Sequence, residues 1–396
     1  MDFRFTPAQN ELREKVRNFA KKFPADRYFC EVPDEGWGTG GYSKEYTRLM
    51  GEHGLLGIAW PKKYGGGGGT VMDYFIVKDE LAYHNVPTQA HFANEGVGFA
   101  ILENGSEELK REFLPKLAKG EILFCQGLSE PNAGSDLLNL KTAAVEDGDD
   151  FIINGRKIWT SYSPISDWVL LIARTDFEAP NHQSLSSFLV DLSLPGVTRR
   201  PIKNMTDDEN VFSEVIFEDV RVPKKYLLGA KNEGFKQVLY ALETDRFWSR
   251  STRAGYTGRL VKEMIAYCKE TVANGKPLIE EPEIGRRIVD LAVKTEVAKV
   301  LNYRAISYMD QGLKLTHQSS MVALFADYLA GETSDTWLRI FGPAAQIMGY
   351  KYSKFGKRME QAAREWLFAP GYLIAGGTPQ IQRNTIALRG LKLPRS

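Results

Sequence analysis

The sequence predicts an α+β protein of three modules: an N-terminal helical domain over residues 1–121, a middle antiparallel β-barrel domain over 122–232 and a C-terminal four-helix bundle over 233–396. The main observation is the spacing of apolar residues. It changes from the period of helices to the two-residue alternation of strands near residue 122, and changes back near residue 233. The length of 396 residues also favours two or three folding modules over one.

The first module begins with the signals of a helix start. Thr6 is expected to cap a helix whose first residue is Pro7, and Gln9 completes a capping box. Apolar residues then recur at three- and four-residue spacing over 11–20 and 107–114. We therefore predict that helices make up this module.

The middle module is predicted from short stretches of alternating or continuous apolar residues. Strands are expected over 151–155, 168–173, 187–192 and 214–220, and Gly, Pro, Asn and Asp turns separate them. Short strands without helices between them are typical of an antiparallel barrel or sandwich.

The last module returns to helical spacing, and its helices are long. We expect them over 234–274, 283–311 and 318–341, with another helix after Gly342 and a short one after Pro379. Long helices joined by short connections favour a bundle.

Composition and charge exclude several kinds of partner. Lys and Arg number 51 and Asp and Glu number 50, so the net charge of +1 offers no patch for nucleic acid or an anionic membrane. No apolar run approaches the roughly 18 residues that span a bilayer. The three cysteines are widely spaced, which predicts neither a disulfide framework nor a metal site and favours a reducing cytoplasm.

Five segments carry a resemblance to a known family. They are WP at 60–61 with YGG at 64–66, GLSEPNAGSD at 127–136, KIWTS at 157–161, FEDVRV at 217–222 and GTPQIQR at 377–383. In this order they resemble the signatures of the acyl-CoA dehydrogenases, which are FAD-dependent enzymes. One such motif would be weak evidence, whereas five in order over almost the whole chain are strong.

The resemblance implies which residues bind FAD and substrate. A flavin ring is flat, with apolar faces and polar edges, so its site needs an aromatic wall and short polar groups; Trp159 is the expected wall. The other expected FAD contacts are Gln126, Leu128, Ser129, Ser161, Thr378 and Gln380. Ser135 and Arg246 are expected to contact the acyl-CoA.

The general base is displaced from its usual position. Most well-known members carry a glutamate just before the Gly-Thr of the last motif, where this chain has Gly376. Some members place the base before an arginine on the first bundle helix, which here is Asp245 beside Arg246. We expect Asp245, on a largely apolar helix face, to have a raised pKa and to act as the base. Gly376 keeps a backbone N–H that can serve as the oxyanion donor.

The alternatives to Asp245 remain open at this stage. Asp245 could instead be an ion-pair residue that contacts Arg246 or Arg250. Glu243 is the rival carboxylate on the same helix, but it points about 160° away. Glu95 and His91 are more distant candidates.

One part of the family's FAD site is missing. In many members an Arg and a Phe after the first bundle helix hold the ADP half of the FAD of a neighbouring subunit, and here Thr271 and Asn274 take their places. Arg339 replaces a glutamine in the next FAD-contacting segment. Either Arg339 supplies the missing charge to the pyrophosphate in a homo-oligomer, or a related partner subunit supplies the contacts in a mixed oligomer.

The predicted reaction is α,β-dehydrogenation of an acyl-CoA thioester, with the β-hydride passing to flavin N5. An electron-transfer flavoprotein is the expected acceptor, and the assembly is expected to be a homotetramer, a homodimer or a mixed tetramer. The alternatives are an FAD-binding or structural subunit of a mixed oligomer, and a flavin monooxygenase on the same fold.

Overall fold

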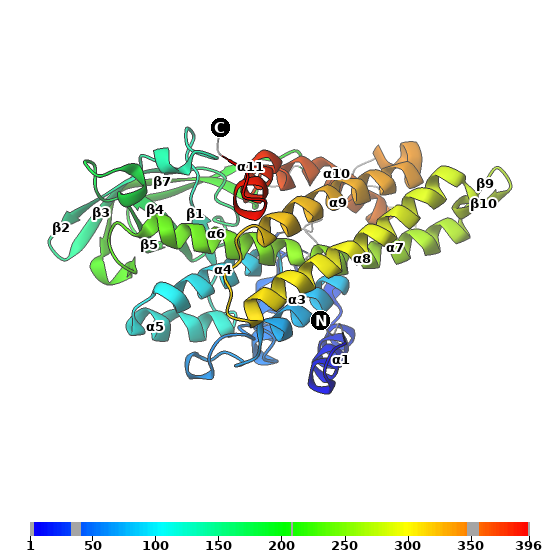
Figure 1. Cartoon of the computed structure of the whole chain (residues 1–396), viewed down its shortest axis with the longest axis horizontal. Helices are drawn as coiled ribbons and strands as arrows, with labels where there is room; N and C mark the ends of the chain where they lie inside the picture. Colours follow the sequence, from blue (N-terminus) through cyan, green and yellow to red (C-terminus); the bar gives the residue numbers. More distant parts are fainter. Residues whose placement is uncertain (1–3, 33–40, 207–208, 347–355, 395–396) are drawn as a thin grey trace.

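The computed structural model describes residues 4–32, 41–206, 209–346 and 356–394 of the chain. Its elements follow the predicted order of helices, then strands, then helices, so the predicted fold class is confirmed. The sheet forms one end of the molecule, the long C-terminal helices extend away from it, and the N-terminal helices pack beneath both (Figure 1).

Four of the five N-terminal helices, all except α4, are capped at their N-termini by hydroxyl side chains. The Thr6 hydroxyl accepts from the Gln9 backbone N–H at 3.2 Å, and the Gln9 side chain accepts from the Thr6 backbone N–H at 3.0 Å, which is the predicted capping box. The helices are α1 (Pro7–Lys22), α2 (Lys44–Glu52), α3 (Val71–Tyr83), α4 (Gln89–Asn104) and α5 (Glu107–Ala118).

The strands of the middle module form an eight-stranded sheet in the order β6-β7-β3-β2-β4-β5-β8, with β1 paired to β4. They are β1 (Phe124–Gly127), β2 (Ala143–Asp147), β3 (Asp150–Lys157), β4 (Trp168–Arg174), β5 (Leu185–Asp191), β6 (Val197–Ile202), β7 (Phe212–Pro223) and β8 (Leu227–Leu228). Most pairs are antiparallel, as predicted. β4 differs, because it runs parallel to both β1 and β2.

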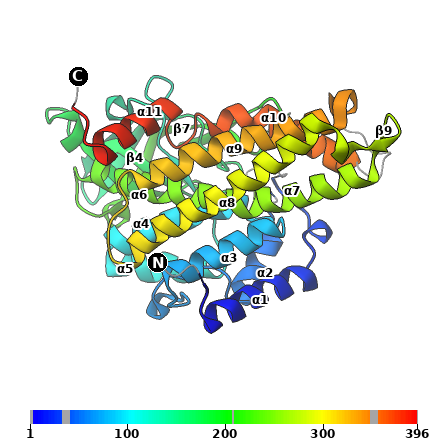
Figure 2. The same ribbon diagram turned by 45° about the vertical axis from the view of Figure 1, so that its right-hand side comes forward.

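The C-terminal helices are α6 (Gly234–Ser251), α7 (Arg253–Glu270), α8 (Pro282–Asp310), α9 (Gln318–Phe341), α10 (Gly356–Tyr372) and α11 (Pro379–Thr385). A short hairpin of β9 (Val272–Ala273) and β10 (Lys276–Pro277) joins α7 to α8. In the turned view α8 and α9 run side by side along the bundle, with α10 and α11 beyond them (Figure 2).

The predicted helix over 234–274 is in fact two helices that meet at Thr252. Hydroxyl side chains around the junction bond to backbone carbonyls one turn back: Ser251 to Trp248 at 3.0 Å and Thr252 to Ser249 at 3.5 Å. Such bonds compete with the helical ladder and favour a bend or break.

All three modules contribute to one small core cluster. Leu123 and Val211 come from the β module, Val32 from the N-terminal module, and Phe368 and Tyr372 from α10. Two segments with expected site residues lie close in the chain to members of this cluster. Residues 157–161 directly precede Tyr162, and residues 374–378 follow shortly after Tyr372.

Candidate active site

The two expected flavin segments of the β module are fastened to each other. The Ile158 backbone N–H donates to the Ser129 carbonyl at 2.9 Å, and the Lys157 ammonium donates to the Leu128 carbonyl at 3.0 Å. The turn after β1 therefore lies directly beside the end of β3. These are the segments that carry the motifs at 127–136 and 157–161.

A buried ion pair supports this junction. Lys157 is fully buried, and its ammonium lies 2.9 Å from a carboxylate oxygen of Glu130, which is itself 9% exposed. The backbone N–H groups of Lys141 and Thr142 also donate to Glu130, at 2.6 and 2.9 Å. Lys157 and Glu130 both lie within the sequence motifs, but neither is among the expected site residues.

The pKa values of the pair reflect burial and mutual attraction. Burial lowers the pKa of Lys157 to about 8, and Glu130 opposes that shift. Burial acts to raise the pKa of Glu130, but Lys157 and the donated hydrogen bonds outweigh it and hold the pKa below its usual value. We conclude that the pair is a structural support of the turn.

Trp159 follows directly and is unusual in two ways. Its backbone φ is 58°, in the left-handed region that non-glycine residues seldom adopt. Trp159 is also 57% exposed, which is high for a tryptophan. Its ring meets Phe212 edge to face at 6.1 Å, and Phe212 stacks on Phe368 of α10 at 5.8 Å. The arrangement holds a large apolar face open to solvent, at a cost in backbone strain that a bound ring would offset.

The surroundings of Trp159 fit the flavin implied by the motifs. The hydroxyls of Thr160 and Ser213 are buried and have no hydrogen-bond partner among the described residues. Ser129 and Ser161 are half-buried, and no hydrogen bond of their side chains is found within the described chain. The polar edge of FAD needs short side chains that are able to form hydrogen bonds, and its flat face needs an apolar surface such as the exposed indole. The expected contacts of Leu128, Ser129, Trp159 and Ser161 with FAD fit these surroundings and stay predictions.

The remaining predicted residues of the first motif lie farther along the chain. Gln126 is half-buried in β1 and pairs in register with Leu170 of β4. Ser135 is exposed in the loop after the β1 turn. Their proposed contacts with FAD and acyl-CoA stay predictions.

The second part of the site is the turn between α10 and α11, which contains Gly376. Arg246 of α6 donates from Nε to the Gly376 carbonyl at 2.7 Å. The Gln382 side chain donates to the same carbonyl at 3.1 Å and to the Gly377 carbonyl at 2.9 Å. Gly376 has φ of 66°, so this turn uses a conformation that favours glycine. Thr378 caps α11, and Gln380 is exposed at its start.

Arg250 contacts this turn and is itself held by Asp327, and neither residue is among the expected site residues. Arg250 lies one helical turn after Arg246 on α6 and donates from Nη2 to the Ala375 carbonyl at 2.7 Å. Its Nε donates to Asp327 of α9 at 3.2 Å, and both side chains are almost fully buried. The i, i+4 spacing of two arginines was the available signal, but Asp327 is 77 residues away in sequence.

Asp245 lies in α6 immediately before Arg246, as predicted, but its side chain lies outside the described residues. The same holds for the side chains of Glu243 and His91. Glu95 is buried 3.3 Å from the Lys78 ammonium and bonds to the Tyr74 hydroxyl. A carboxylate bound to a cation is a weak base, so these contacts argue against Glu95, and the role of Asp245 stays a prediction.

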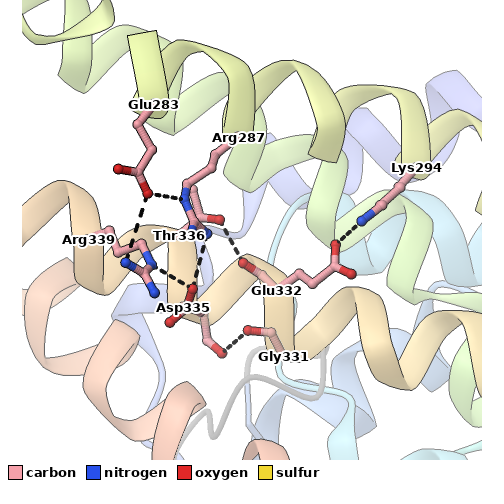
Figure 3. A network of polar contacts seen from close by, with 9 residues as sticks. Glu283, Arg287, Lys294, Gly331, Glu332, Asp335, Thr336 and Arg339 are labelled. Carbon is pink, nitrogen blue, oxygen red and sulfur yellow. Dashed lines mark hydrogen bonds and ion pairs between the residues drawn. The ribbon is translucent and has the colours of Figure 1, made fainter. Parts of the chain in front are cut away.

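The segment around Arg339 is rich in carboxylates (Figure 3). Arg339 contacts Asp335 at 2.8 Å and Glu283 at 4.0 Å. Arg287 contacts the same two carboxylates, at 3.1 and 3.2 Å. A pyrophosphate here would have to displace or approach two acidic side chains.

Thr271 and Asn274 have local structural roles. Thr271 caps the end of α7, and Asn274 with Gly275 makes the turn of the β9–β10 hairpin. Both turn residues have positive φ, 52° and 77°, as a two-residue Asn-Gly hairpin requires.

Comparison with known proteins agrees with the motifs. The chain matches the N-terminal, middle and C-terminal domains of acyl-CoA dehydrogenases over residues 6–121, 125–220 and 232–391. It is 33% identical to acyl-CoA dehydrogenase FadE26 of Mycobacterium tuberculosis, over 100% of both chains. The chain belongs to the acyl-CoA dehydrogenase family. It is thus an FAD-dependent oxidoreductase that acts on the CH–CH bond of acyl-CoA thioesters.

Two further acyl-CoA dehydrogenase relatives are informative about assembly. The chain is 31% identical to the caffeyl-CoA reductase-Etf complex subunit CarC of Acetobacterium woodii, over 96% of this chain and 98% of the relative. It superposes on a chain of the ChsE4-ChsE5 complex of Mycobacterium tuberculosis with a TM-score of 0.84 and 31% identity, over 100% of both chains. No helix among the described residues is long and apolar enough to cross a membrane.

Proposed function

We propose that Asp245 removes the α-proton of the acyl-CoA and that the Gly376 N–H binds the thioester oxygen as negative charge develops on it. The observation that carries the proposal is the 2.7 Å bond from Arg246 Nε to the Gly376 carbonyl. It fastens the residue next to Asp245 to the turn that holds the oxyanion donor. This contact supports the proposal, because it holds α6 next to position 245 against a turn that lies 130 residues further along the chain.

The chemistry requires three contributions from the protein. Asp245 accepts a proton at its carboxylate, the Gly376 amide stabilises the enolate oxygen, and Trp159 with the turn at 128–129 orients the flavin. FAD, when bound, accepts the hydride from the β-carbon.

Substitution of Asp245 tests the base. Asp245→Asn should retain FAD but lower the rate of anaerobic flavin bleaching by about 10²–10⁴-fold, the usual contribution of a general base. The assay should use straight, branched and alicyclic acyl-CoAs, because no sequence feature identifies the acyl group. Asp245→Glu is the matched control and should recover part of the rate. Full bleaching by Asp245→Asn with FAD bound would disprove the assignment.

A mixed oligomer is the assembly that the Arg339 network favours. Because Asp335 and Glu283 already contact Arg339, Thr271 caps α7 and Asn274 makes the hairpin turn, this chain offers little to the ADP half of a neighbour's FAD. A related subunit would supply those contacts, and the matched ChsE4-ChsE5 structure is a complex of two named chains.

The surface of α8 supports association with another subunit. Four valines at spacings of four, four and three residues form one exposed stripe along this helix: Val289, Val293, Val297 and Val300. An exposed apolar stripe of this kind marks an interaction surface. A groove of about 490 Å³ also lies between α8, α9 and α11, with Leu301 and Phe325 among its lining residues.

The FAD content of an Arg339 variant separates the two assemblies. In the mixed oligomer, Arg339→Ala should bind as much FAD as the wild type, because Arg339 contacts carboxylates and not phosphate. Loss of FAD from this variant would instead support the homo-oligomer in which Arg339 holds the pyrophosphate. Native mass spectrometry of the purified assembly should show a second, related polypeptide.

An electron-transfer flavoprotein is the proposed acceptor. The name of CarC describes a subunit of a reductase complex with Etf, which supports an electron-transfer flavoprotein as the redox partner. Dehydrogenation of the acyl-CoA would make that partner the acceptor here. The reduced enzyme should be reoxidised by purified electron-transfer flavoprotein much faster than by oxygen, as followed by flavin absorbance under stopped flow.

A further inference from the structure

The peptide group between Ala375 and Gly376 carries the proposed oxyanion donor at one end and an acceptor for Arg250 at the other. Arg250 Nη2 donates to the Ala375 carbonyl at 2.7 Å. The peptide is planar and trans, so its C=O and N–H point in opposite directions. Fixing the Ala375 oxygen therefore fixes the direction of the Gly376 N–H.

The guanidinium that makes this contact is itself fixed by two others. Its Nε donates to Asp327 at 3.2 Å and its Nη1 donates to the Ser249 hydroxyl at 2.7 Å. Arg250 is 5% exposed and Asp327 is 6% exposed, so water does not compete for these bonds. The planar guanidinium donates these three hydrogen bonds in fixed directions, whereas a lysine ammonium at the end of a flexible chain does not hold such a fixed geometry.

Arg250 also occupies the space beside Gly376. A Cβ atom on Gly376 would lie 3.2 Å from Nη1 and 3.4 Å from Nη2 of Arg250. A side chain at this position would press on a guanidinium that its partners hold in place. Many family members carry their base at this position. Here the guanidinium of Arg250 occupies the space that such a side chain would need.

The peptide group that follows is held as well, because Arg246 and Gln382 both donate to the Gly376 carbonyl. We propose that Arg250 is a positioning residue that orients and polarises the Gly376 amide, so that this N–H is aimed and strengthened as the oxyanion donor. A charged donor on the carbonyl strengthens the N–H of the same peptide by about 10–30% per bond in a hydrogen-bond chain. The inference rests on the proposed role of Gly376.

The infrared spectrum of a bound thioester tests Arg250 directly. The probe is 3,3-dimethylbutyryl-CoA labelled with ¹³C at the thioester carbonyl, which has no β-hydrogen and cannot be oxidised. In the wild-type holoenzyme its carbonyl stretch should move to lower wavenumber than in water. Arg250→Gln should lose most of this displacement, and Arg250→Lys should retain part of it. With a reactive acyl-CoA, Arg250→Gln should lower kcat by about 10–100-fold and leave KM and FAD content within about twofold.

Arg358→Gln is the matched control. Arg358 is another arginine of the bundle, with a side chain that is only 13% exposed and is paired with Glu365 at 3.0 Å. Its contacts within the described chain are with Glu263, Glu365 and Trp337 rather than the Gly376 turn. It should leave the carbonyl stretch unchanged. If Arg250→Gln does not fold, Arg250→Lys carries the test, because it keeps the buried charge.

Two results would overturn separate parts of the argument. A wild-type carbonyl stretch equal to that in water would refute the oxyanion role of Gly376, and with it the proposed function. A displaced wild-type stretch that persists fully in Arg250→Gln and Arg250→Lys would refute only the role of Arg250.

Discussion

At the scale of single residues, the buried Lys157–Glu130 ion pair should contribute strongly to the stability of the turn at 128–130. Two charges are held out of water, and each depends on the other. Removing one partner of a buried pair leaves an uncompensated charge, which costs about 3–5 kcal/mol. We expect Lys157→Met to lose about that much stability in urea unfolding of the holoprotein, and to bind FAD more weakly because the 128–130 turn loses its support.

Arg156→Met is the control for this prediction. Arg156 precedes Lys157 in β3 and contacts Glu214 at 3.5 Å, but its side chain is 64% exposed. An exposed pair of this kind contributes about 0–1 kcal/mol. Equal losses of stability in Lys157→Met and Arg156→Met would contradict a special role for the buried pair.

The residues of the site differ in how far the sequence could predict them. Trp159 and Gly376 could be predicted because Trp159 lies in a short motif and Gly376 directly precedes one. Arg250 was not predicted as a site residue, because its role depends on contacts with Ala375 and Asp327, which are 125 and 77 residues away. A buried side chain's partners are set by helix packing, which no local pattern encodes.

At the scale of elements, helices were predicted better than strand pairing. The cap of α1 depends on residues within three positions of each other, and it was predicted correctly. The parallel pairing of β4 with β1 depends on strands about 40 residues apart, and the sequence pattern favoured an all-antiparallel sheet. The junction at Thr252 was also missed, because apolar spacing continues through it while the hydroxyls redirect the backbone bonds.

Two glycines on α7 offer a matched test of how tightly α3 and α7 pack. A Cβ on Gly255 would lie 2.5 Å from the backbone oxygen of Asp79 on α3, whereas a Cβ on Gly258 would meet Thr295 at an ordinary 3.6 Å. Gly255→Ala should therefore destabilise the protein by about 1–3 kcal/mol through overpacking.

Gly258→Ala should instead gain about 0.5–1 kcal/mol, since alanine is the better helix former. Chemical unfolding of both variants measures the difference. Unchanged stability in Gly255→Ala would show that α3 and α7 are not in such close contact, and a loss in Gly258→Ala would contradict the ordinary contact found at that position.

At the scale of the whole molecule, aromatic side chains join the three modules. Phe212 of the β module stacks on Phe368 of α10, and Trp248 of α6 packs at 4.3 Å from Tyr74 of α3. The sequence predicted the three modules from periodicity alone. It could not predict their interfaces, because these combine residues from distant parts of the chain.

One carboxyl at such an interface should make the stability of the whole protein depend on pH. The Oδ1 atom of Asp79 is buried between α3 and α7 and has no hydrogen-bond partner in the described part of the chain. Burial raises the pKa of Asp79 to about 7, and the neighbouring Glu80 adds to the shift. Between pH 4 and 7 the folded protein holds a proton there that the unfolded chain has released.

Stability from this group is therefore fully present below about pH 4 and is lost as the pH rises through 7. Asp79→Asn cannot ionise, so it should be more stable than the wild type at pH 8, by about 1–3 kcal/mol for a buried unsatisfied polar group, and nearly equal to it at pH 4. Urea unfolding at the two pH values measures this, with the exposed Asp149→Asn as control. A stability difference between wild type and Asp79→Asn that does not grow with pH would mean that Asp79 does not keep its proton in the folded state.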